Sequence, residues 1–213
     1  MTMVANARTL TIGAVPLSRA AQLAYAPTMD TAPEDSALML RYRDGDVAAF
    51  EALYRRHNDA LYRYLLRLCH NRDAAEDIFQ EVWGKIIKAR DKYRPTAKFT
   101  TFLYRVAHNC FIDHIRRNKR HTHTADIEPD HQPDTGDCTE MQVERSLARR
   151  RLLDALQQIP DEQRDVFLLR EEAGFSLDDI ASITGTNRET AKSRLRYAVN
   201  KLRAAIDEPA GKS

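Results

Sequence analysis

Polar and cationic side chains recur at helical spacing near the carboxyl end of the sequence. At about 100° per residue, one side of this segment carries Glu189, Ser193, Arg196, Tyr197 and Asn200, with Lys192, Arg194, Lys201 and Arg203 on its flanks. Cations bind phosphates and polar side chains read base edges, so the pattern suits a helix that enters a DNA groove. A solvated surface helix would show a similar face, and this alternative stays open.

Two capped helices around a tight turn are expected to position these side chains. Ser176 caps the first helix, with Asp179 as its capping-box partner, and Gly185 supplies a left-handed residue at its end. Thr186 is expected to cap the second helix, with Glu189 completing the box. Apolar residues fall on one side of each helix: Leu177, Ile180, Ala181 and Ile183 in the first, and Ala191, Leu195, Ala198, Leu202 and Ile206 in the second. We therefore predict a helix-turn-helix.

The composition fits a helical protein of one or two small domains. The chain has 213 residues, 43% hydrophobic and 30% charged, with few glycines and prolines and a net charge of +2. Its three cysteines are far apart and form no CxxC pair, which favours reduced thiols and a cytoplasmic protein. No apolar run reaches the roughly 18 residues of a membrane span.

Composition shifts divide the chain. Residues 1–36 lack a sustained period and are expected to be disordered. Helical patterns fill 37–120 and 147–207, leaving a tail at 208–213. The segment 121–146 is acidic and interrupted by Pro and Gly, as expected of a flexible linker. We predict an all-α fold with two small helical domains.

The first domain holds an acidic helix face. Asp73 is expected to cap a helix with Glu76 as its partner, and Asp77, Gln80 and Glu81 lie opposite the apolar stripe of that helix. A solvated face is the simpler reading. The functional reading is a docking face for a basic protein.

Cations and aromatic residues alternate in the loop that follows, residues 91–99. Lys and Arg beside Tyr93 and Phe99 suit stacking of unpaired bases, although the aromatic rings could equally fold back into the core. The next helix, about 101–119, carries one polar strip of Arg105, Asn109, Asp113 and Arg116 and a cationic end. That end complements the helix dipole or binds phosphate.

No catalytic chemistry is evident in the sequence. It contains no nucleophile with an adjacent base and no phosphate-binding loop, and the scattered histidines and Cys138 match no closed zinc pattern. We predict no catalytic residues, no metal and no cofactor.

Three motifs, in order, resemble bacterial RNA polymerase sigma factors. The block from Asp73 to Trp83, DAAEDIFQEVW, resembles their polymerase-docking helix, and Phe99 to Arg117, FTTFLYRVAHNCFIDHIRR, looks like their promoter-melting segment. Residues 156–167 and 180–202 resemble their fourth conserved region. There is no room for the third domain of the larger members, so the chain resembles the extracytoplasmic-function (ECF) type.

This resemblance implies a transcription initiation factor with three kinds of contact. Asp77, Gln80 and Glu81 would dock on core RNA polymerase. The minus-ten promoter element would be bound by Tyr93, Arg94, Lys98, Phe99, Phe102, Arg105, Asn109, Asp113, Arg116 and Arg117. The minus-thirty-five element would be read by Arg188, Glu189, Thr190, Lys192, Ser193, Arg194, Arg196 and Tyr197. A monomeric free protein and an anti-sigma partner are also implied.

Departures and rival readings qualify this picture. Phe102 stands where the family usually has Trp, Glu189 where Gly is common, and Ala191 where Val is usual. A helix-turn-helix repressor or activator that never joins polymerase is the main alternative, but it leaves the block at 73–83 unexplained. A nucleic-acid enzyme would need converging acidic or His residues.

Overall fold

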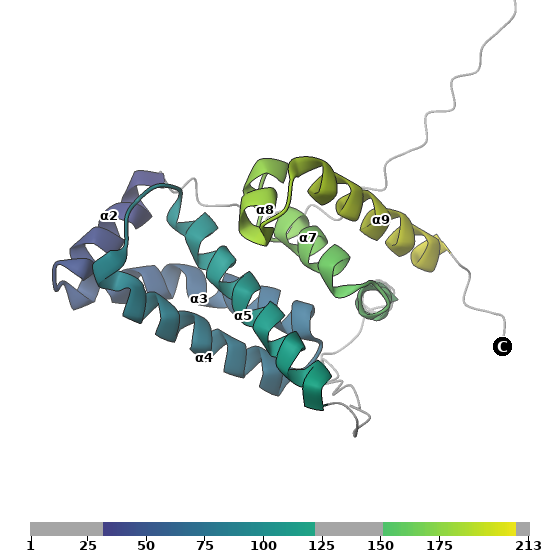
Figure 1. Cartoon of the computed structure of the whole chain (residues 1–213), viewed down its shortest axis with the longest axis horizontal. Coiled ribbons are helices and arrows are strands. Elements are labelled where there is room, and N and C mark those ends of the chain that lie inside the picture. The colour runs from purple at the N-terminus through teal and green to yellow at the C-terminus, as the bar shows by residue number, and fades with distance from the viewer. Residues whose placement is uncertain (1–31, 122–150, 208–213) are drawn as a thin grey trace, which may run out of the picture. The chain divides into compact units, whose positions relative to one another are not determined.

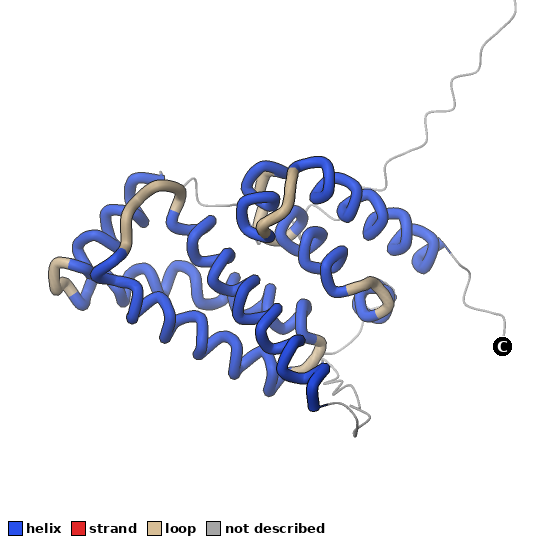
Figure 2. The backbone as a smooth tube through the Cα atoms, in the orientation of Figure 1, coloured by secondary structure: helices blue, strands red, loops and turns tan. Residues whose placement is uncertain are grey.

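The regular elements of the described chain are all helices. The structure, a computed structural model, describes residues 32–121 and 151–207 (Figure 1). Coiled segments joined by short loops account for both ranges (Figure 2). The predicted all-α fold class is confirmed. The predictions for residues 1–31, for the linker beyond His121 and for the tail at 208–213 lie outside the described residues.

The first range folds as a helical bundle. Its elements are α2 (Ala32–Arg43), α3 (Val47–Cys69), α4 (Arg72–Ala89), the short 3₁₀ helix η1 (Arg90–Lys92) and α5 (Phe99–His121). Helices α2 and α4 pack against α3, and α5 packs against α4. The apolar stripes of these helices meet in the core, where Leu53, Leu65 and Ile78 are almost completely buried.

Helix α2 begins earlier than the sequence suggested. The expected boundary was residue 37, but the helix starts at Ala32. Asp35 is only 4% exposed, and its carboxylate contacts Arg56 and, at 2.9 Å, Nε2 of His57. This buried acid on α2 is paired with side chains of α3, so the start of the helix is part of the first domain.

Asn71, rather than Asp73, caps α4. His70 ends α3 in the left-handed region, with φ of 54°, and Asn71 follows with extended backbone. The side-chain oxygen of Asn71 accepts a hydrogen bond of 2.8 Å from the Ala74 amide. The prediction of Asp73 as the cap was wrong because Asp73 already lies in the first helical turn, where its charge favours the helix dipole.

The second range contains the predicted helix-turn-helix. Residues 151–157 are helical, followed by α7 (Asp161–Glu171), α8 (Leu177–Thr184) and α9 (Arg188–Asp207). Ser176 and Asp179 form the predicted capping box. Gly185 ends α8 with φ of 64° and ψ of 29°. Because β-carbon-bearing residues rarely adopt this conformation, the glycine sets the turn between the two helices.

The cap of α9 differs from the prediction. The Asn187 side chain accepts a hydrogen bond of 2.7 Å from the Thr190 amide, so Asn187 is the cap. Thr186 instead places its hydroxyl 3.0 Å from the hydroxyl of Thr184. The predicted box of Thr186 and Glu189 was therefore one residue out of register.

Two apolar clusters stabilise these helices. The larger runs through α2 to α5 and includes Val166, Leu169 and Phe175 from the second range. The smaller one joins residues 155–159 to the buried Ala198 and Leu202 of α9. Together they fix α8 and α9 by their apolar sides and leave the opposite side of α9 in solvent.

Candidate nucleic-acid interface

The outward side of α9 carries most of the predicted DNA contacts. Ala191 and Ala198 face the core, and the opposite side of the helix is exposed. The exposed members of the predicted set are Arg188, Glu189, Lys192, Arg196 and Tyr197, whereas Thr190, Ser193 and Arg194 are half-buried. The hydroxyl of Ser193 donates to the Thr190 carbonyl at 2.9 Å. Base-edge contacts in this conformation are therefore available mainly to the exposed members.

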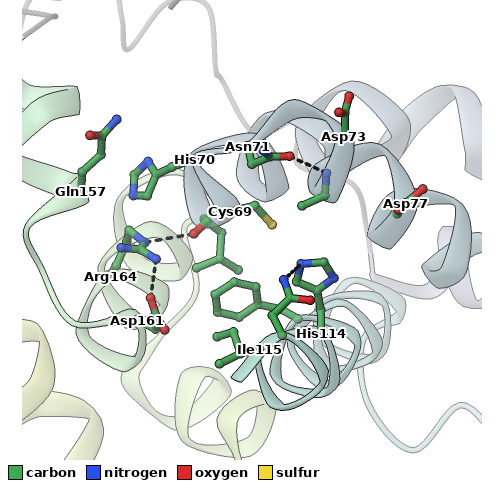
Figure 3. A pocket seen from close by; sticks show the side chains of 14 residues that line it. Cys69, His70, Asn71, Asp73, Asp77, His114, Ile115, Gln157, Asp161 and Arg164 are labelled. Carbon is green, nitrogen blue, oxygen red and sulfur yellow. Dashed lines mark hydrogen bonds and ion pairs between the residues drawn. The ribbon is translucent and has the colours of Figure 1, made fainter. Parts of the chain in front are cut away.

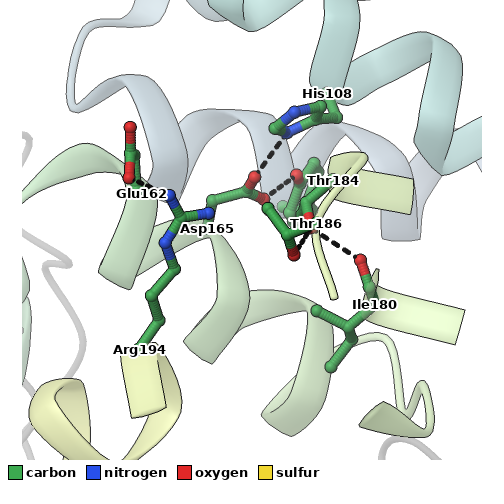
Figure 4. Close-up of polar contacts among 8 residues, drawn as sticks. His108, Glu162, Asp165, Ile180, Thr184, Thr186 and Arg194 are labelled. Carbon is green, nitrogen blue, oxygen red and sulfur yellow. Dashed lines mark hydrogen bonds and ion pairs between the residues drawn. The ribbon is translucent and has the colours of Figure 1, made fainter. Parts of the chain in front are cut away.

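Nearby acids pair with several cations of α9. Arg188 Nε lies 3.3 Å from Asp178 of α8, and Lys192 Nζ lies 3.7 Å from Glu189. Arg194 forms an ion pair with Glu162 of α7 (Figure 4). These pairs hold the cations near the helix surface, and each exposed pair contributes little to stability.

Arg196 and Tyr197 make a different contact. The guanidinium carbon of Arg196 lies 5.4 Å from the centre of the Tyr197 ring, within the range of a cation–π interaction. Tyr197 is 55% exposed, so its ring is accessible from solvent. This exposed pair can therefore meet a ligand without disturbing the core.

A second polar surface runs along α5. Arg105, Asn109, Asp113 and Arg116 are all exposed, as the predicted strip requires. Asp113 Oδ1 lies 3.9 Å from Arg116 and Oδ2 lies 4.0 Å from Lys85 of α4. At spacings of three and four residues, the four side chains occupy one face of the helix.

Buried aromatic residues lie at both ends of the loop before α5. Tyr93 is 5% exposed and Phe99 is 1% exposed, whereas residues 94–98 between them are all exposed. Phe102 is half-buried, with its ring centre 5.5 Å from that of Tyr93. Of the two alternatives open at the sequence level, the structure has the rings folded into the core. Tyr93 and Phe99 anchor the loop and offer no free face for a stacked base.

The acidic face of α4 is partly engaged within the protein. Asp77 and Gln80 are exposed, but Glu81 is half-buried. The carboxylate of Glu81 accepts hydrogen bonds from Lys85 at 2.9 Å and from Arg117 of α5 at 3.1 Å. The bond from Lys85, followed by that from Arg117, lowers the pKa of Glu81. Glu81 therefore links the α4 face to the cationic end of α5.

Two hollows flank the exposed part of α4. One, of about 620 Å³, is lined by residues that include Asp73, Asp77, His114 and Arg164 (Figure 3). The other, of about 370 Å³, is lined by residues that include Tyr54, Tyr62, Phe79 and Gln80. Asp77 and Gln80 thus stand at the edges of two concave surfaces, which is a suitable shape for a protein contact.

Two polar side chains that line the larger hollow have shifted pKa values. Burial, followed by the nearby charge of Arg164, lowers the pKa of His70 to about 4, and its buried Nε2 has no hydrogen-bond partner among the described residues. Burial raises the pKa of the Cys69 thiol to about 12. Arg164 donates to the Leu68 carbonyl at 3.0 Å and to Asp161 at 2.6 Å (Figure 3). At neutral pH, His70 is therefore uncharged, and Cys69 is a thiol rather than the reactive thiolate.

A buried carboxylate was missed by sequence reasoning. Asp165 of α7 is 2% exposed and lies 2.6 Å from Nδ1 of His108 on α5 (Figure 4). It also accepts a hydrogen bond from the hydroxyl of Tyr64 on α3. No local pattern could have indicated this group, because its partners are 57 and 101 residues away in the sequence.

Neither a metal-binding cluster nor a membrane-spanning helix occurs among the described residues. Within 32–121 and 151–207, no group of three or more His, Cys, Asp or Glu side chains is arranged to hold a metal ion. Over the same ranges, none of the helices combines the length and the apolar character needed to cross a bilayer.

Comparison with known families identifies both helical ranges. Residues 53–121 match Sigma-70 region 2, and residues 149–202 match Sigma-70, region 4. RNA polymerase sigma factor CarQ of Myxococcus xanthus is 32% identical over 170 residues, which cover 80% of this chain and 96% of CarQ. ECF RNA polymerase sigma factor SigM of Mycobacterium tuberculosis is 32% identical over 168 residues, covering 79% and 82% of the two chains.

Solved structures share the fold. CnrH, in complex with the cytosolic domain of CnrY, matches with a TM-score of 0.61 at 21% identity, covering 83% of this chain and 99% of CnrH. The sigma factor RpoE of Bartonella quintana, in complex with the anti-sigma factor NepR, matches with a TM-score of 0.63 at 24% identity, covering 75% and 98%. These two matches support the arrangement of helices described above.

Proposed function

Because this chain belongs to the Sigma-70 family of bacterial RNA polymerase sigma factors, and to its ECF type, we propose that three of its exposed surfaces make three different contacts. As a sigma factor it binds core RNA polymerase and directs it to promoters. The repressor alternative is not favoured. The proposal assigns polymerase docking to α4, minus-ten binding to α5 with its preceding loop, and minus-thirty-five reading to α9.

Polymerase docking is assigned to Asp77 and Gln80, with Glu81 beside them. The observation that carries this assignment is the exposure of Asp77 and Gln80 on a helix whose opposite side, including Ile78 and Val82, is buried. Neither residue is needed for packing, and both border concave surfaces. A basic partner helix would find a carboxylate and an amide there.

Minus-ten binding is assigned to the exposed strip of α5 and to the loop at 94–98. Arg94 and Lys98 are exposed cations in that loop, and Phe102 is its partly accessible ring. Arg105, Asn109 and Arg116 supply hydrogen-bond donors along the helix, with Asp113 between them. Tyr93 and Phe99 keep their place in this site as buried anchors that shape the loop.

Minus-thirty-five reading is assigned to the outward side of α9. A recognition helix contacts base edges with residues near its N-terminus, where Arg188, Glu189 and Lys192 lie. Arg196 follows one or two turns later. Thr190, Ser193 and Arg194, which are all half-buried, are assigned supporting or phosphate contacts.

The proposal also covers the cellular setting. CnrH and RpoE were solved with CnrY and with the anti-sigma factor NepR, respectively. We extend this pattern to an anti-sigma partner for the present chain, which would hold it in the cytoplasm as an inactive complex. We further propose that the protein acts by binding alone, without catalysis or a cofactor, and is monomeric when free.

The docking assignment is tested with the double variant Asp77→Ala/Gln80→Ala. Its affinity for core polymerase should fall, while its melting temperature should stay close to that of the wild type because both side chains are exposed. Glu51→Ala is the matched control, since Glu51 is an exposed acid of α3 paired only at the surface with Arg55. Unchanged polymerase affinity in the double variant, measured by fluorescence anisotropy, would remove the assignment.

A further inference from the structure

Glu189 occupies the base-facing side of α9 near its start. The helix begins at Arg188 after the Asn187 cap, and the Glu189 side chain is 76% exposed. It lies on the side of the helix opposite the buried Ala191 and Ala198. If α9 enters a DNA groove by its N-terminal part, this carboxylate enters with it.

The carboxylate has acceptor capacity left for a ligand. Its ion pair within the described residues is with Lys192, one turn further on, at 3.7 Å. An ionised carboxylate offers about four lone-pair positions and no donor. Because phosphates repel it, a favourable contact with DNA requires a hydrogen-bond donor on a base edge.

The chemistry of the major groove restricts the choice of base. Only adenine and cytosine present amino donors there, and adenine places the N7 acceptor beside its amino group. An amide side chain satisfies both groups of adenine, whereas a carboxylate meets N7 with a second acceptor. Guanine presents two acceptors, and thymine presents one beside a methyl group. Cytosine, with its N4 amino group, is therefore the base that suits Glu189.

The position of Arg196 on α9 predicts the spacing between its base contact and that of Glu189. It lies seven positions after Glu189 on the same exposed side, which places it about 10 Å further along the helix. That length corresponds to roughly three base pairs of B-DNA. Arg196 is exposed and contacts the Tyr197 ring, and a guanidinium can donate two hydrogen bonds to O6 and N7 of guanine.

We propose that Glu189 is a specificity-determining residue that selects a cytosine in the upstream promoter element, about three base pairs from a guanine read by Arg196. The inference rests on the proposed role of α9. A simpler account exists, in which Glu189 only complements the dipole at the start of the helix. That account predicts a small effect on stability and no effect on base preference.

The test is transcription by core polymerase reconstituted with the full-length protein on promoter fragments randomised in the upstream element. Sequencing of the transcripts should show the wild-type protein favouring cytosine at one position. Glu189→Gln should reduce this preference at least about 5-fold and shift it towards adenine, because an amide both donates and accepts. Preferences at other positions should be unchanged, and circular dichroism should show an intact fold.

The matched control is Asp178→Asn. It removes the same unit of charge from an exposed acid of α8 that pairs with Arg188 and is not itself an assigned DNA contact. This control should leave the cytosine preference intact, which separates base reading from general electrostatics. Arg196→Ala should relax the guanine position, about two to four base pairs away by the rise of the helix.

Each result bears on either the cytosine assignment or the sigma-factor function. A Glu189→Gln protein that transcribes all sequences with an unaltered base preference, or with a uniform change, would overturn the cytosine assignment and leave the sigma-factor function standing. If the wild-type protein yields no transcript from any fragment, the proposed function fails, and the inference fails with it.

Discussion

Gly185 sets the turn between α8 and α9, the helix proposed to read DNA, so its replacement tests the geometry of the site. Its backbone lies in the left-handed region, and its amide donates to the Ala181 carbonyl. A β-carbon at this position would meet no atom within 4 Å. The cost of Gly185→Ala is therefore backbone strain alone, about 1 to 2 kcal/mol of the free energy of unfolding.

Gly84 provides the matched control for that change. It lies within α4, and an added β-carbon there also meets nothing within 4 Å. Gly84→Ala should stabilise the protein by about 0.5 to 1 kcal/mol, because alanine loses less conformational entropy in a helix. The Gly→Ala substitution should therefore lower the free energy of unfolding at position 185 and raise it at position 84.

Urea unfolding followed by circular dichroism measures both variants. Gly185→Asn should fall between Gly185→Ala and the wild type, since asparagine tolerates the left-handed region better than alanine. Equal midpoints for the wild type and Gly185→Ala would refute the reasoning. So would a Gly84→Ala protein that is destabilised as much as Gly185→Ala.

Two further predictions follow from the caps and the titrating groups. Because the pKa of His70 is about 4 in the folded chain and 6.5 for an unperturbed histidine, the contribution of this ring to stability is complete above pH 6.5 and is lost as the pH falls towards 4. Because the ring is partly exposed, solvent screening reduces the expected loss of unfolding free energy to about 1 to 2 kcal/mol. The urea midpoint of His70→Asn should therefore change less between pH 6.5 and pH 4 than that of the wild type. The same pH dependence in both proteins would contradict the assignment of this effect to His70. Asn187→Ala should cost about 1 kcal/mol as a lost helix cap, whereas Thr186→Ala should cost less; the reverse order in thermal melts would restore Thr186 as the cap of α9.

Local patterns predicted the helix-turn-helix well. The Ser176 box, the left-handed Gly185 and the inward Ala191 and Ala198 depend on neighbours within one or two helical turns, and all were confirmed. The family was recognised in the same way, from motifs whose order and spacing lie in the sequence. The roles of the individual site residues stay predictions.

The two wrong caps have a common cause. Asn71 and Asp73 can both accept a hydrogen bond from a helix amide, as can Thr186 and Asn187. The residue that becomes the cap is the one with extended backbone at the helix start. For α4, the left-handed conformation of His70 makes Asn71 the cap, and no sequence pattern indicated that conformation.

Side-chain burial from distant segments could not be predicted. The loop sequence suited Tyr93 and Phe99 equally to stacking on bases and to packing, and their burial depends on neighbours in other helices. By sequence alone, Asp165 resembles any charged residue of a short helix. Its hydrogen bonds to Tyr64 and His108 exist only because α7 packs against α3 and lies beside α5.

The most direct test of the account is run-off transcription with purified protein, bacterial core polymerase and a library of promoter fragments. If the protein is a sigma factor, new, sequence-selective transcripts that require it should appear, and they should be lost with the Asp77→Ala/Gln80→Ala variant. Tight, sequence-specific DNA binding by the protein alone, with no transcript when polymerase is added, would contradict it.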